Sequence, residues 1–191
     1  MFRAGLWAAL LLLGSSAASA RQGIPVCRAP FGRLLGDAVF RRYPAAPLPA
    51  STRLLPPDVR SGQARRYRTL LREDVRGAPD FAGHYALVRI GCGAATVCVA
   101  IADRLTGKVF FPPNLRSATA LIYDTGKRDV SQLAYRRDSR LLIVAGSPNE
   151  DERSAGLSYY LWEAHRLKRI RFVPVRALCG SRSGASWWVG D

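Results

Sequence analysis

Residues 81–101, FAGHYALVRIGCGAATVCVAI, have the pattern of a β-hairpin. Two runs of apolar and β-branched residues, 84–90 and 97–102, flank the glycine-rich sequence GCGAA, which suits a turn. Side chains alternate with period two along a strand. The residues that this alternation places on one face are His84, Ala86, Val88, Ile90 and Cys92. That face is small and mostly apolar, so we expect it to belong to the core.

The two cysteines of this stretch favour a disulfide across the hairpin. A pairing of Cys92 with Cys98 sets the expected cross-strand neighbours, which are Ile90 with Ala100 and Val88 with Ala102. The opposite face then carries a mixed set of side chains, which are Tyr85, Leu87, Arg89 and Asp103.

The first twenty residues have the features of a secretory signal peptide. Arg3 precedes an apolar run at 6–13, and the segment ends in the small residues Ala18-Ser19-Ala20. The apolar run is shorter than the roughly 20 residues needed to span a bilayer. We therefore expect cleavage near Ala20 and an exported protein, periplasmic or secreted, that does not span the membrane.

Four cysteines in an exported chain indicate two disulfides, and four cysteines allow three pairings. Cys92 and Cys98 are close neighbours, whereas Cys27 and Cys179 lie near the two ends of the mature chain. We favour Cys92 with Cys98 and Cys27 with Cys179.

The chain is strongly basic, with a formal net charge of +15, and most of its cations are arginines. One interpretation is a solvated arginine-rich surface. The other is a patch that binds anionic envelope material, such as lipid head groups or acidic glycans, or a partner protein. Export argues against nucleic acid as the natural partner.

Three regions follow one another along the chain. Residues 21–57 are rich in proline and predict an extended arm, and residues 58–191 predict a single β-rich domain. An amphipathic helix is expected at about 60–75, with a basic outer face. The apolar residues at helical spacing are Ala64, Tyr67, Leu71 and Val75, and Leu70 widens the stripe.

Short strands with tight turns fill the rest of the domain. The candidate strands after residue 107 are KVFF, SQLAYRR, RLLIVAG, LSYYLWEA and LKRIRFVPV. Strands joined by short turns form antiparallel sheets. The expected fold is α+β and mainly β: an antiparallel sheet of hairpins, loosely like propeller blades, with one N-terminal amphipathic helix.

Four segments carry a family resemblance. They are DFAGHYALVRIGCG, IADRLTGKVFFPP, YRRDSRLLIVAGSPNE and YYLWEAHRLKRI. Over about residues 62–173 the chain resembles a family of uncharacterised exported bacterial proteins that carry a signal peptide and an arginine-rich helix. The resemblance implies export. It transfers no activity, so no catalytic residue follows from it.

His84 and the acidic loop GSPNEDE, residues 146–152, are the candidates for chemistry. A hydrolase of envelope material would use His84 with Glu150 or Asp151. A zinc set of His84, Cys92, Cys98 and His165 matches no common ligand spacing, and the loop acids match no calcium motif. We expect neither a metal nor a cofactor, and favour a hydrogen-bonded His84 at the edge of the core.

Surface residues near these segments are the candidates for ligand binding. They are Tyr85, Arg89, Asn149, Glu150 and Tyr159. Aromatic residues at 159–162 and 187–188 suit either a sugar or peptide groove or, as we favour, the core. The leading hypothesis is therefore a non-enzymatic binding domain, and the alternative is the hydrolase.

Overall fold

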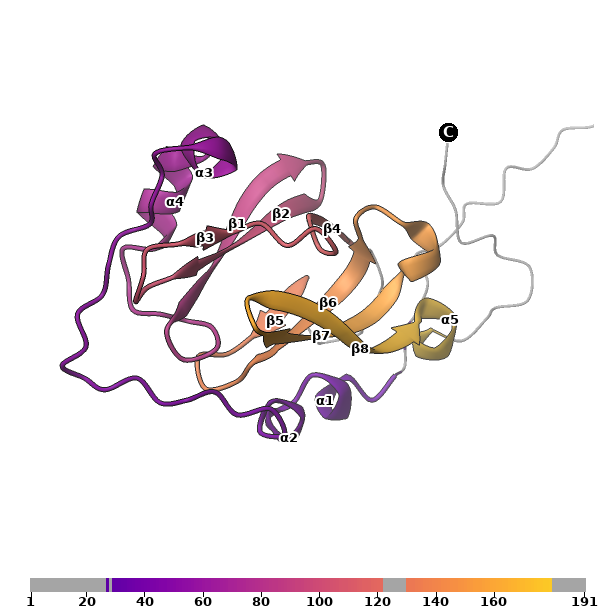
Figure 1. The fold of residues 1–191 in the computed structure, drawn as a ribbon. Helices are drawn as coiled ribbons and strands as arrows, with labels where there is room; N and C mark the ends of the chain where they lie inside the picture. Colours follow the sequence, from indigo (N-terminus) through magenta and orange to yellow (C-terminus); the bar gives the residue numbers. More distant parts are fainter. Residues whose placement is uncertain (1–26, 28, 122–129, 180–191) are drawn as a thin grey trace, which may run out of the picture.

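The computed structural model describes residue 27 and residues 29–121 and 130–179, and it is mainly an antiparallel β-sheet (Figure 1). The strands are β1 (Tyr85–Gly93), β2 (Thr96–Asp103), β3 (Val109–Phe110), β4 (Ser117–Ala120), β5 (Leu133–Tyr135), β6 (Leu141–Pro148), β7 (Gly156–Glu163) and β8 (Arg166–Pro174). The helices are α1 (Phe31–Leu34), α2 (Asp37–Phe40), α3 (Gly62–Arg66), α4 (Arg68–Asp74), the 3₁₀ helix η1 (Glu152–Ser154) and α5 (Val175–Leu178). The predicted mainly-β α+β class is confirmed.

The open sheet joins two antiparallel meanders through one short strand. Its main order is β1-β2-β4-β6-β7-β8, with β3 paired to β2 and β5 paired to β6. Strands β5 to β8 pair consecutively, as the strands of one propeller blade do. β4, which the sequence did not predict, pairs with β2 on one side and β6 on the other. It therefore holds the two meanders in one sheet.

The largest core cluster lies between the two meanders. β1 and β2 contribute Tyr85, Leu87, Val99 and Ile101. β6 and β7 contribute Leu142, Val144, Tyr160 and Trp162. Because side chains from both halves meet in one cluster, the sheet curves around them. The second face of the β1–β2 hairpin is mixed, as expected: Tyr85 and Leu87 are buried, and Arg89 is exposed. Because Tyr85 is buried, the structure does not support it as a surface residue for ligand binding.

The hairpin register differs from the predicted one by two residues. Ile90 pairs with Cys98 and Val88 with Ala100, because the register shifts between Gly91 and Gly93. A shift of two preserves the face on which each side chain lies. The small apolar face of the hairpin consequently lies in the core, as expected.

The helical region at 60–75 forms two short helices, not one. The chain leaves helical geometry at Tyr67, where φ is −102° and ψ is 20°, and this residue separates α3 from α4. Leu71 and Val75 are buried against β1 and β2, with Ala64 and Tyr67 packed at the edge of the same cluster. Leu70, predicted to widen the apolar stripe, is 45% exposed.

The proline-rich arm is only partly extended. The sequence predicted an irregular segment, but α1 and α2 form near its start, because Phe31 and Phe40 bury their rings against β6 and β7. The arm then runs around the molecule to α3 without a helix or strand (Figure 1). Hydrogen bonds from the Leu55 N–H to the Arg104 carbonyl, and from the Asp58 N–H to the Gly107 carbonyl, attach it to the turn after β2.

Some predictions fall on residues that the structure does not describe. The proposed signal peptide and the tryptophans at 187–188 lie outside the described residues. Within the described ranges, no helix combines the length and the apolar character that crossing a membrane requires.

Candidate functional site

Both predicted disulfides are present. One joins Cys92 to Cys98 at the tip of the β1–β2 hairpin, and the other joins Cys27 to Cys179, which are 152 residues apart. The described residues include no free cysteine. Sulfur in a disulfide is not the thiolate that zinc binding or nucleophilic attack needs. The zinc set written from the sequence is therefore not assembled in this structure.

The acidic loop after β6 is held by its own contacts. Asn149 accepts a hydrogen bond from the Arg116 N–H at 2.7 Å and donates one to the Asn114 carbonyl at 3.1 Å. Glu150 is exposed and accepts from the Ser117 hydroxyl at 3.5 Å. Both residues thus connect this loop to the segment around β4.

Asp151 caps the N-terminus of the helix η1. Its carboxylate accepts hydrogen bonds from the N–H and Nε of Arg153 and from the hydroxyl of Ser154. These contacts, chiefly that with the Arg153 side chain, lower the pKa of Asp151. Asn149 and Asp151 also line a pocket of about 340 Å³, together with Tyr160 and Arg169.

Tyr159 is a core residue. It is 2% exposed, and its hydroxyl donates a hydrogen bond to the Leu34 carbonyl at 3.1 Å. The Arg171 guanidinium lies over its ring at 5.1 Å. The ligand-binding role predicted for Tyr159 would need an exposed ring, so the structure does not support that role. Arg89, another candidate, is exposed, and its N–H donates to Asp74.

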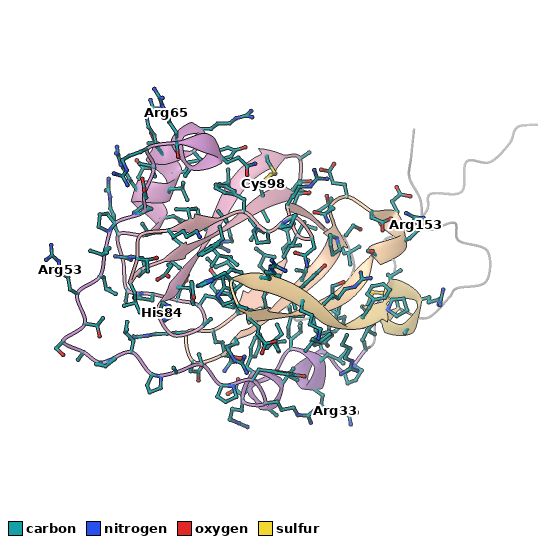
Figure 2. The ribbon with its side chains drawn as sticks, viewed as in Figure 1. Arg33, Arg53, Arg65, His84, Cys98 and Arg153 are labelled. Carbon is teal, nitrogen blue, oxygen red and sulfur yellow. A yellow bond between two sulfur atoms is a disulfide. The ribbon has the colours of Figure 1, made fainter. Side chains whose placement is uncertain are left out.

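His84 immediately precedes β1 and lies beside the end of β2. Its Nε2 is 3.6 Å from Oδ1 of Asp103, and its ring packs on Tyr85 with a centroid distance of 4.2 Å. Asp103 also accepts hydrogen bonds from Leu105 and Thr106 in the turn that follows β2. His84 and Arg153, which follows the loop acids, lie far apart in Figure 2. The structure therefore does not bring His84 together with Glu150 or Asp151.

The second histidine lies on the same aromatic cluster. His165 stacks on Phe110 at 4.8 Å with an interplanar angle of 6°. The Tyr85 and Trp162 rings are 6.5 and 6.4 Å from His165. Both histidines of the chain therefore lie around Tyr85 at the end of the sheet that carries the β2–β3 and β7–β8 turns.

A groove of about 690 Å³ adjoins this cluster. It lies between the start of α3 and the β2–β3 turn, and its lining includes Gln63, Asp103, Lys108, Phe110, Phe111 and His165. Asp58, at the rim, has its pKa lowered to about 2, mainly by hydrogen bonds from the Arg60 side chain. The two carboxylates of the groove thus already have donors, whereas Lys108 belongs to none of the ion pairs found between described residues.

Exposed arginines gather beside the groove. The α3–α4 arginines are Arg65, Arg66, Arg68 and Arg72, all exposed. None of them belongs to an ion pair within the part of the chain that the structure describes. Figure 2 shows Arg65 pointing away from the sheet at the corner that α3 and α4 form. This corner therefore carries four exposed arginines without an ion pair among the described residues, beside the exposed acids Glu73 and Asp74 of α4.

Sequence reasoning missed most of the groove. Asp103, Lys108 and Phe110 stood out only as parts of a turn and a strand, and His165 only as a turn residue and a zinc candidate. Phe110 and His165 are far apart in the chain, and no local pattern links them.

Comparison of the chain with protein-family models, with curated proteins and with solved structures found no match.

Proposed function

We propose that this disulfide-stabilised protein is an exported, non-enzymatic binding domain for anionic envelope material. The observation that carries the proposal is the corner formed by the α3–α4 arginines, which are exposed and have no acidic partner among the described residues. Unpaired guanidinium groups on one surface attract polyanions and bind carboxylate or phosphate through paired hydrogen bonds.

Export is part of the same proposal. The N-terminal signal-peptide pattern and the resemblance to exported bacterial proteins support it. Two disulfides also suit an oxidising compartment better than a reducing one. Anionic glycans and lipid head groups are abundant in such a compartment.

The contacts of the acidic loop favour binding over hydrolysis. A hydrolase acting through His84 and a loop acid needs the two side chains within hydrogen-bond reach of each other or of one water. His84 instead faces Asp103, and the loop acids contact Ser117 and Arg153. Asp103 is in turn occupied by the N–H groups of its own turn.

A matched pair of charge variants tests the proposal. One variant carries R65Q, R66Q, R68Q and R72Q. The control carries R33Q, R41Q, R42Q and R137Q, which removes the same charge from exposed residues elsewhere. Binding of lipopolysaccharide and of polygalacturonate is measured by titration at low and at physiological salt.

We expect the α3–α4 variant to lose about tenfold or more in affinity for at least one polyanion, and the control to lose much less. The wild-type affinity should fall as salt rises, because exposed charges are screened. Equal losses in the two variants would show that only net charge matters, and would overturn the proposal.

A further inference from the structure

We propose that the groove between α3 and the β2–β3 turn binds an acidic oligosaccharide, a short chain of sugars that carry carboxylates. This inference rests on the proposed function and names the class of ligand. It is carried by three properties of the groove: a stacked aromatic platform, hydrogen-bonding side chains, and a cation without an acidic partner among the described residues.

The platform is the stack of His165 on Phe110. Phe110 covers one face of the imidazole, and His165 as a whole is exposed. Ala164 and His165 form the β7–β8 turn with φ of 47° and 60°, a conformation that residues other than glycine rarely adopt. This turn places the imidazole against Phe110. Flat rings of this kind pack against the C–H face of a sugar.

Side chains with hydrogen-bonding capacity surround the platform. Ser61, Gln63 and Thr106 line the same groove. Hydroxyl and amide groups both donate and accept hydrogen bonds, as sugar hydroxyls do. A groove of about 690 Å³ is large enough for a small ligand of several rings.

The cations beside the groove favour an acidic sugar over a neutral one. Lys108 places its ammonium 5.1 Å from the centroid of Phe110, next to the platform. The Asp58 carboxylate is paired with the Arg60 guanidinium, and the Asp103 carboxylate accepts hydrogen bonds from the β2–β3 turn and keeps its charge. The α3–α4 arginines start two residues beyond Gln63. Lys108 and these arginines give the α3 side of the groove a positive charge, which would attract the carboxylates of an acidic sugar chain.

The test is a calorimetric titration of the exported protein with tetragalacturonic acid and with maltotetraose. The first is a chain of four acidic sugars, and the second is a neutral chain of the same length. Two groove variants, H165N and K108Q, are compared with the wild type. Asparagine tolerates positive φ, so H165N keeps the turn and removes the ring face. The control is R153Q, because Arg153 is 93% exposed and distant from the groove.

We expect saturable binding of tetragalacturonic acid and at least tenfold weaker binding of maltotetraose. H165N should weaken the affinity for tetragalacturonic acid by about threefold to tenfold, and K108Q by about twofold to fivefold. R153Q should leave this affinity unchanged. Unaltered unfolding midpoints would show that the variants fold.

Two results would overturn the inference. One is equal affinity for the acidic and the neutral tetrasaccharide, and the other is unchanged affinity in both groove variants. If polygalacturonate binding is lost in the α3–α4 variant but kept in H165N and K108Q, the groove inference fails while the proposed function stands. If the α3–α4 variant binds polygalacturonate as the wild type does, the proposed function fails as well.

Discussion

Arg104 shows how a charged side chain can be structural in a protein rich in arginine. It is 7% exposed, and its guanidinium donates to the carbonyls of Val75, Gly77 and Leu55 at 2.5, 2.9 and 3.0 Å. Burial lowers its pKa. One side chain thereby joins the arm, the end of α4 and the end of β2. Nothing in the local sequence distinguishes it from the exposed arginines nearby, so its role could not be predicted.

Tyr135 gives a pH-dependent prediction. Burial, reinforced by the neighbouring Asp80 carboxylate, raises its pKa from 10.0 to about 12. The folded state therefore holds this proton more tightly than the unfolded state. The stabilisation is fully present below pH 10 and is lost as the pH rises from about 10 to about 12. Urea unfolding at a series of pH values measures this. Across this interval the free energy of unfolding of the wild type should fall more steeply with pH than that of Y135F.

Comparing the wild type with Y135F separates the effect of Tyr135 on stability from that of the other tyrosines whose pKa is raised. These are Tyr85, Tyr159 and Tyr160. The Y135F variant should lose less stability than the wild type between pH 10 and 12. Parallel stability curves over that range would show that the folded state does not retain the Tyr135 proton.

Among the elements, the strands with apolar runs could be predicted, and β4 could not. β1, β2, β6 and β7 contain such runs, and their residue patterns located them to within a few positions. β4 has the sequence SATA, which lacks a run of large apolar residues. Its strand conformation depends on pairing with β2 and β6, segments far away in the chain. The break at Tyr67 was likewise invisible, because the helical spacing continues through it.

The exposed edge of β1 is protected by carboxylates. The N–H of Leu87 donates to Asp80 at 2.9 Å, and the N–H of Arg89 donates to Asp74 at 3.2 Å. These N–H groups would otherwise be available to another strand. The acids before the hairpin thus have a structural role that the sequence pattern did not indicate.

The junction of β4 and β6 gives a prediction at the scale of elements. A Cβ added at Gly146 in β6 would collide with the Thr119 carbonyl of β4. We expect G146A to destabilise the protein by about 1–3 kcal/mol, because the two strands must move apart. The control is G91A, since a Cβ at Gly91 meets no atom within 4 Å.

Chemical unfolding of both variants measures the difference. G91A should stay close to the wild type. If G146A were as stable as G91A, the close approach of β4 to β6 would not contribute to holding the two meanders together.

At the scale of the molecule, the disulfides could be predicted but the groove could not. The positions of the four cysteines near the chain ends and within one hairpin favoured the observed pairing. The groove instead combines residues from 58–64, 103–111 and 165, which curvature of the sheet and the course of the arm bring together. Such a combination depends on tertiary structure, and no local periodicity encodes it.

The two disulfides should contribute unequally to stability. In the chain-entropy model the contribution grows with the enclosed length, so the bond spanning 152 residues should contribute about 5 kcal/mol and the bond spanning 6 about 2 kcal/mol. We expect C27A/C179A to shift the urea midpoint more than C92A/C98A. The opposite order would show that the short bond stabilises the hairpin mainly through its native contacts.

The bond between Cys27 and Cys179 also makes the backbone between them a closed ring. A protease that cuts once in an exposed turn, such as the one at Leu105 and Thr106, would open this ring without releasing a fragment. The nicked protein would remain one covalent molecule and would separate into two pieces only under reducing conditions. A single cut in a surface turn therefore need not dismantle the protein.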